Sequence, residues 1–150
     1  MSISAEREGH TYDPAQPYQV SREAVREFAA AVKAEHPAHF EPEAALRLGH
    51  ADLVAPPSFA VVVAQRAEAA VINDPAAGID FSRVVHAEER FTHHAPITAG
   101  EALTGQTTLD RIRVMGGGAM VTTVTEITNQ DGQAKSTVTS SLLVRAEEES

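Results

Sequence analysis

Polar side chains that could carry out acid–base chemistry gather in one short stretch early in the chain. Glu35, His36 and His39 stand there around Pro37. A carboxylate and an imidazole that grip one water can move a proton to or from a substrate. His39 is therefore a candidate general base, and Glu35 is a candidate carboxylate partner. The alternative for His39 is a loop histidine without a chemical role, and His36 is expected to cap the carbonyl groups that precede it.

Three further histidines could suggest a metal site. His86, His93 and His94 all lie in a segment with the period of a strand. His93 and His94 are adjacent, so their side chains would point to opposite faces of the sheet, which is poor geometry for one ion. No aspartate or cysteine stands nearby at ligand spacing. We therefore expect no metal.

The size and composition of the chain limit the functions open to it. Its 150 residues suit a single domain with a buried core, spanning residues 1–150. Cysteine is absent, which excludes disulfides and thiolate chemistry. The formal charge of −9 argues against broad binding to nucleic acids. No stretch reads as a signal peptide or a membrane span, so we expect a cytoplasmic protein without membrane insertion.

The most apolar stretch of the chain, residues 57–72, is expected to be a central helix. Its first half is apolar on every side, which is typical of a helix in a protein interior. Pro56 and Pro57 suit a helix start, and the Asn-Asp-Pro sequence at residues 73–75 suits its end. The valine run could also form a strand, but the neighbouring alanines and the length favour a helix.

The spacing of apolar residues predicts the remaining elements. Helices are expected at residues 21–35, with Ser21 as the N-cap, and at residues 42–48, with Gly49 at the end. From Arg83 onward the period changes to two, which is typical of strands. Strands are expected at residues 18–20, 84–92, 102–114, 119–128 and 133–145, the last four as an antiparallel meander. This order predicts an α+β fold in which a sheet wraps around the central helix.

A set of residues spread along almost the whole chain resembles a known family. The residues are 20–23, 26–28, 31–32, 36–39, 43–45, 48–50, 53–56, 84–86, 91, 96–97, 99–103 and 131–132. As an ordered set they resemble the MaoC-like, FAS1-type dehydratases, including the small (3R)-hydroxyacyl-thioester dehydratase subunits of actinobacteria. The resemblance implies the hot-dog fold, in which a curled antiparallel sheet of about five strands surrounds one long helix.

Active members of this family use an Asp-x-Asn-Pro-x-His motif, which falls on residues 34–39 here. Pro37 and His39 match the motif. Ala34 stands at the position of the aspartate, and alanine cannot act as an acid or a base. His36 stands at the position of the asparagine. Glu35 would have to replace the aspartate from the next position, and one step along a helix end turns a side chain by roughly 100°.

The start of the central helix is the expected acyl-binding region. The resemblance implies that a backbone N–H there polarises the thioester carbonyl. The glycine that supplies this N–H in relatives falls near Pro57, and proline has no N–H. Pro57, Ser58, Phe59 and Val62 are expected to bind the substrate, with Phe59 and the valine run shaping an apolar tunnel.

The loss of two catalytic elements implies a binding role. The chain would be the acyl-chain-binding, catalytically degenerate subunit of a heteromeric (3R)-hydroxyacyl-thioester dehydratase or (R)-specific enoyl hydratase. Its partner would be a MaoC-like subunit with an intact Asp and His, its ligand an acyl-CoA or acyl-carrier-protein thioester, and no cofactor is expected. The alternatives are a homodimeric hydratase or dehydratase that uses His39, another hot-dog thioester enzyme that uses Glu68 far along the central helix, and a structural dimer without a ligand.

Overall fold

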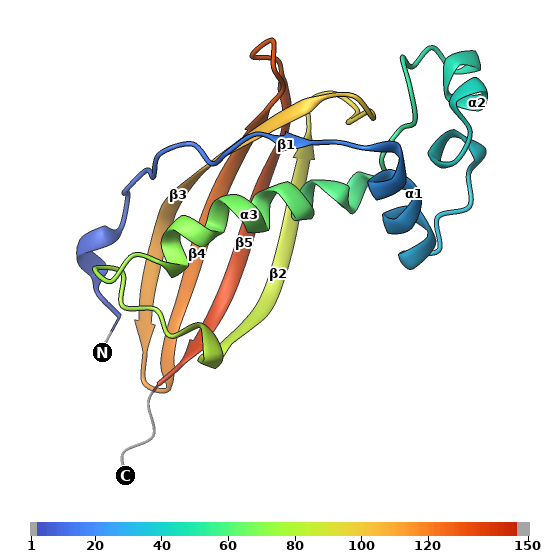
Figure 1. The fold of residues 1–150 in the computed structure, drawn as a ribbon. Helices are drawn as coiled ribbons and strands as arrows, with labels where there is room; N and C mark the ends of the chain where they lie inside the picture. The colour runs from blue at the N-terminus through green and yellow to red at the C-terminus, as the bar shows by residue number, and fades with distance from the viewer. Residues whose placement is uncertain (1–2, 147–150) are drawn as a thin grey trace.

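The protein consists of one long helix laid across a curled antiparallel sheet, with two short helices at one end (Figure 1). The structure is a computed structural model and describes residues 3–146. The helices are α1 (Arg22–Ala31), α2 (Pro42–Arg47) and α3 (Ala60–Ile72), and the strands are β1 (Tyr18–Gln19), β2 (Val84–His93), β3 (Ala102–Met115), β4 (Gly118–Thr128) and β5 (Ala134–Arg145). This arrangement confirms the hot-dog fold.

The central helix forms where the sequence predicts it. A 3-10 turn at Pro57–Phe59 leads directly into α3, so the helical run covers residues 57–72. The side that faces the sheet is buried and carries mostly small apolar residues: Ala60, Val63, Ala64, Ala67 and Val71. The outer side is more open, since Val62 is half-buried and Gln65 is exposed. The first half of the helix is therefore not buried on every side.

The order of the strands corrects the expected meander. The sheet has five strands in the order β1-β3-β4-β5-β2. A meander would place β2 beside β3, but β2 pairs with β5, with Phe91 opposite Val138. Only β3, β4 and β5 follow one another as hairpin neighbours, and Gly116 and Gly117 make the expected turn between the first two. The period-two pattern gives the strands but carries no information on which strands pair.

The two edges of the sheet differ in how they are covered. Beyond β1, the N-terminal arm runs along the outer edge of β3 and bonds to it through the backbone. The N–H groups of Gly9, Tyr12 and Ala15 donate to carbonyl groups of β3. The strand at the opposite edge is β2, which pairs with β5 on one side. Most residues of β2 are exposed. Of the residues that the structure describes, β2 thus forms the open edge.

The first helix begins as predicted and ends earlier than expected. The Ser21 side chain accepts the N–H of Ala24 and caps the start of α1. The helix stops at Ala31 rather than near Glu35, because Lys33 adopts a left-handed conformation with φ of 59°. The N–H of Ala34 then donates to the carbonyl of Ala29 at 2.8 Å, which closes a Schellman motif. Ala34 and Glu35 therefore lie on a loop instead of on a helix.

The interior of the fold contains two apolar clusters. One surrounds Phe59 at the start of the central helix, and the other surrounds Val71 at its end. Buried polar residues lie among them on the helix and the sheet: Glu68, Thr107, Thr123, Thr125, Ser136 and Ser140. Among residues 3–146, no helix is long and apolar enough to cross a bilayer.

Candidate active-site groove

His39, the candidate base, is held in place by a short 3-10 helix. This helix spans Pro37–His39, and it begins with a proline, which suits a first helical position. The Nδ1 atom of His36 accepts the N–H of Ala38 at 3.1 Å. His36 is thus a cap, as expected, but it caps the N–H groups that follow it and not the carbonyls that precede it. The cap fixes the path of the chain up to His39.

A backbone carbonyl orients the imidazole of His39. The Nδ1 atom lies 2.5 Å from the carbonyl oxygen of Val54. A carbonyl oxygen can only accept, so Nδ1 carries the hydrogen and a neutral ring keeps its lone pair on Nε2. In this geometry Nε2 is the atom that can accept a proton. A backbone carbonyl, that of Val54, therefore sets the orientation of this imidazole.

The half-buried His39 forms part of the wall of a groove of about 470 Å³. Most of the residues that line this groove are apolar. They come from three segments of the chain: His39; Val54, Ala55, Pro56 and Pro57; and His93, His94, Ala95, Pro96 and Ile97. The second and third segments are joined by backbone hydrogen bonds, including one from the N–H of Ala55 to Ile97 at 2.8 Å. None of the described residues that line the groove carries a carboxylate.

The groove brings His93 and His94, for which the sequence predicts no metal, close to His39. Nδ1 of His93 lies 3.0 Å from the hydroxyl of Ser136, and Nε2 of His94 lies 3.0 Å from that of Thr137. These partners are neighbours in β5, so the two rings do point to opposite sides. Among the described residues, no group of three or more His, Asp or Glu could hold a metal. Their position at the end of β2, where the strand meets the rim of the sheet, was the sequence signal that could have placed them in the groove.

The residues expected to bind the acyl chain are divided between the groove and the core. Pro57 lines the groove, and Ser58 is half-buried beside it. Phe59 lies in the core with 1% of its surface exposed, and its ring meets that of Phe28 edge-on at 5.3 Å. Val62 packs against the same cluster. Phe59 thus belongs to the same core cluster as the lining residues Ala55 and Ile97, but it does not itself line the groove.

The start of the central helix offers fewer donors than usual. The first N–H groups of a helix have no partner within it, and together with the helix dipole they attract negative charge. Pro57 occupies the first position of the 3-10 turn and has no N–H. The N–H of Phe59 already donates to Pro56 at 2.9 Å. The N–H of Ser58 is therefore the donor of this turn that could meet an oxyanion.

The two candidate carboxylates, Glu35 and Glu68, are not among the residues that line the groove. Glu35 is exposed on the loop after α1. Glu68 is buried under the sheet with 3% of its surface exposed, and it accepts the hydroxyl hydrogen of Thr123 at 2.8 Å. Burial raises the pKa of Glu68, although the hydrogen bond from Thr123 opposes this shift. The groove thus contains an oriented imidazole, and none of the described residues that line it is acidic.

Comparison with known proteins reveals both sequence relatives and structural relatives. Residues 7–137 match the family described as FAS1-like, dehydratase domain region. Over 148 residues the chain is 43% identical to a UPF0336 protein of Clavibacter michiganensis, and the match covers 99% of each protein.

Solved structures of dehydratases share the fold at appreciable identity. A MaoC-like dehydratase matches with a TM-score of 0.84 at 31% identity, over 93% of this chain and 42% of that longer protein. A C-terminally truncated HadBC (3R-hydroxyacyl-ACP dehydratase) complex from Mycobacterium tuberculosis matches with a TM-score of 0.77 at 30% identity, over 94% of this chain and 100% of that chain. The chain therefore belongs to the FAS1-like dehydratase domain family and has the hot-dog fold of the MaoC-like dehydratases.

Proposed function

We propose that this chain is the acyl-chain-binding, catalytically degenerate subunit of a heteromeric (3R)-hydroxyacyl-thioester dehydratase, or (R)-specific enoyl hydratase. The observation that carries the proposal is a groove with an oriented His39 and no carboxylate among its described lining residues. Dehydration of a hydroxyacyl thioester needs an acid and a base acting together. In the proposal, residues 1–150 form one hot-dog domain in the cytoplasm, and the missing acid comes from a partner.

The proposed ligand is an acyl thioester of coenzyme A or of acyl carrier protein. Pro57 and the neighbouring apolar residues of the groove would contact the thioester end, and the N–H of Ser58 would face its carbonyl oxygen. The acyl chain would run along the outer side of α3, where Val62 is half-buried rather than fully covered. Phe59 would set the shape of this path from behind.

The proposed partner is a MaoC-like subunit with an intact Asp and His. The similarity to HadBC, which is a complex of a 3R-hydroxyacyl-ACP dehydratase, supports a two-subunit assembly. The exposed edge at β2 gives such a subunit a place to extend the sheet, because the N-terminal arm already covers the other edge.

The second candidate is a homodimeric hydratase or dehydratase that uses His39. The hydrogen bond from His39 to Val54 favours it, because an oriented imidazole retains part of the catalytic machinery. The burial of Glu68 away from the groove weighs against a thioesterase that uses this carboxylate. A dimer with a purely structural role would leave the groove without a ligand.

A steady-state assay separates these functions. We would measure hydration of trans-2-enoyl thioesters by the chain alone, by a MaoC-like subunit with an intact motif, and by the mixture. The chain alone should be close to background, since losing one oxyanion donor typically costs about 10²–10³ in rate and losing acid–base help costs about 10²–10⁴. The mixture should be active.

The variants His39→Ala and His50→Ala complete the test, because His50 does not line the groove. Turnover by the chain alone that disappears in His39→Ala and persists in His50→Ala would reject the binding-subunit function and establish the homodimeric enzyme. A mixture that is no more active than the MaoC-like subunit by itself would also reject the proposal.

A further inference from the structure

A buried ion pair lies beside the groove, and the proposed function assigns it no role. Nζ of Lys135 and Oε2 of Glu101 are 2.9 Å apart. Only 5% of Lys135 and 9% of Glu101 are exposed. Asn129 donates to the same carboxylate oxygen at 3.0 Å. Because a buried ion pair adds little net stability over an apolar pair of similar volume, its role is better sought in what it holds in place.

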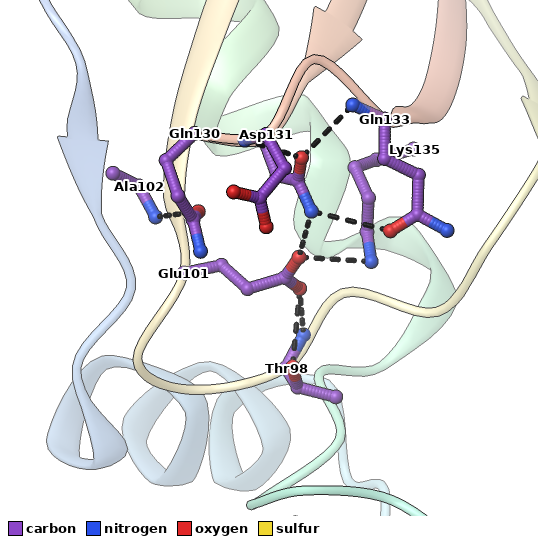
Figure 2. A network of polar contacts seen from close by, with 8 residues as sticks. Thr98, Glu101, Ala102, Gln130, Asp131, Gln133 and Lys135 are labelled. Atoms are coloured by element: carbon purple, nitrogen blue, oxygen red, sulfur yellow. Dashed lines mark hydrogen bonds and ion pairs between the residues drawn. The ribbon is translucent and has the colours of Figure 1, made fainter.

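Both members of the pair hold the same loop, which forms one wall of the groove. Figure 2 shows the carboxylate of Glu101 between Lys135 and Thr98, where Oε1 accepts the N–H of Thr98 at 2.8 Å and its hydroxyl hydrogen at 3.1 Å. The backbone carbonyl of Lys135 accepts the N–H groups of His94 and Ala95 at 2.9 and 3.2 Å. The side chain of Glu101 therefore holds one end of residues 94–98, the backbone of Lys135 holds the other end, and the ion pair links the two anchors. This loop includes four groove-lining residues.

The loop in turn fixes the segment that orients His39. The N–H of Ala55 donates to Ile97 at 2.8 Å, and the N–H of Ala99 donates to Leu53 at 2.9 Å. Val54 lies between these two hydrogen bonds, and its carbonyl oxygen accepts the hydrogen on Nδ1 of His39. A displacement of the loop would therefore move the acceptor that sets the tautomer of the imidazole.

We propose that Glu101 and Lys135 are positioning residues for His39, which act through the loop at residues 94–98 and the carbonyl of Val54. The inference rests on the proposed function in that His39 then faces the bound thioester. Burial alone would raise the pKa of Glu101, but hydrogen bonds from Asn129 and Thr98 and the ammonium group of Lys135 hold it below its usual value. The carboxylate is thus charged at neutral pH and accepts all of these bonds.

The experiment reads the imidazole itself, so it needs neither turnover nor a partner subunit. Long-range ¹H–¹⁵N spectra of the ¹⁵N-histidine-labelled chain report the tautomer of His39 and the exchange rate of the hydrogen on Nδ1. Both carboxylate oxygens of Glu101 accept hydrogen bonds. In Glu101→Gln one of these oxygens becomes an NH₂ group, which cannot accept a hydrogen bond from the donors that face it. We expect His39 to lose its fixed Nδ1–H tautomer and that hydrogen to exchange about tenfold faster, which corresponds to ~1.4 kcal/mol.

The matched control is Glu68→Gln, another buried carboxylate changed to its amide, which does not contact the groove loop. It should leave the His39 signals unchanged. If Glu101→Gln does not fold, the double variant Glu101→Met with Lys135→Met removes both charges together, a change that buried pairs often tolerate. Amide exchange in β3–β5 checks that the sheet is intact.

Two results would overturn the inference. One is an unchanged His39 tautomer in a folded Glu101→Gln or double variant, and the other is a change of equal size in Glu68→Gln. Because the spectra are recorded on the chain alone, failure of the subunit-mixing assay would reject the proposed function and leave this result standing. A normal mixing assay with an unmoved His39 would reject only the positioning role.

Discussion

Single residues decide what chemistry the groove can support. The carbonyl of Val54 orients His39 as a carboxylate could, but it cannot take up a proton. Orientation and proton transfer are therefore separated in this chain. Residue types in the motif at residues 34–39 predict the loss of the acid, because Ala34 stands where an aspartate would act. They do not predict the orienting carbonyl, since every residue has one and only the folded path of the chain selects it.

Glu68 should make stability depend on pH. Burial raises its pKa above the ordinary value of 4.5. The folded chain then holds this proton to higher pH than the unfolded chain, so stability falls as the pH rises from about 4.5 through the raised value. Each pKa unit between the folded and the unfolded chain corresponds to about 1.4 kcal/mol of unfolding free energy. Urea unfolding at several pH values between 4.5 and 8 should show this fall in the wild type and a smaller fall in Glu68→Gln.

The surroundings of Glu68 define the control. Glu89 raises its pKa further and His86 opposes that effect, so the variant His86→Ala tests the neighbours without changing the carboxyl group. His86→Ala should keep most of the fall in stability with pH. If Glu68→Gln shows the same pH dependence as the wild type, the titration of Glu68 does not contribute.

At the level of the elements, the end of α1 depends on an unusual residue. Lys33 occupies the left-handed position that closes the helix, with φ of 59°, where glycine is usually found. A side chain in this conformation costs roughly 1–2 kcal/mol. Lys33→Gly should therefore stabilise the protein by about 0.5–1 kcal/mol in urea unfolding. Ala30→Gly, on the exposed face of the same helix, should instead destabilise by about as much.

The two faces of α3 should respond differently to charge. Val63 faces the sheet with 3% of its surface exposed, whereas Gln65 is exposed. Val63→Asp would bury an unpaired carboxylate and should prevent folding, because such burial costs several kcal/mol. Gln65→Asp should change stability by about 0.5 kcal/mol or less. Circular dichroism and soluble yield distinguish the two variants, and a folded Val63→Asp protein would contradict the orientation of the helix.

Local sequence was sufficient to predict the elements and insufficient to predict how they pair. Apolar spacing and the prolines at positions 56 and 57 locate α3, and period-two segments locate four of the strands. The pairing of β2 with β5 depends on contacts between distant residues such as Phe91 and Val138, which no local pattern contains. The early end of α1 was missed for a local reason, because lysine rarely adopts the conformation that Lys33 has here.

At the scale of the whole molecule, the proposed subunit role rests on the groove and on the open edge of the sheet. The arm and β1 cover the edge at β3, while β2 presents unpaired backbone and exposed side chains on the other side. An uncovered edge of this length is a site for pairing with another chain. The exposed Glu88 and Arg90 pair with each other at 2.7 Å, and Glu89 adds a further carboxylate to the strand. Both observations favour assembly through β2, either with a second copy or with a related subunit.

The last prediction is that a charge on β2 weakens this assembly. Val85 lies on β2 with 51% of its surface exposed. Val114 has 68% of its surface exposed and lies on β3, which β4 and β5 separate from β2 in the sheet. Lysine on an edge strand opposes pairing with another strand, because its charge would have to be desolvated or screened. Val85→Lys should weaken association at least about tenfold in sedimentation velocity, equivalent to ~1.4 kcal/mol. Val114→Lys adds the same charge away from β2 and should leave association unchanged. Equal association of both variants would place the interface elsewhere. Edge-to-edge assembly would be refuted if the wild-type chain stays monomeric at micromolar concentration, both alone and with a MaoC-like subunit.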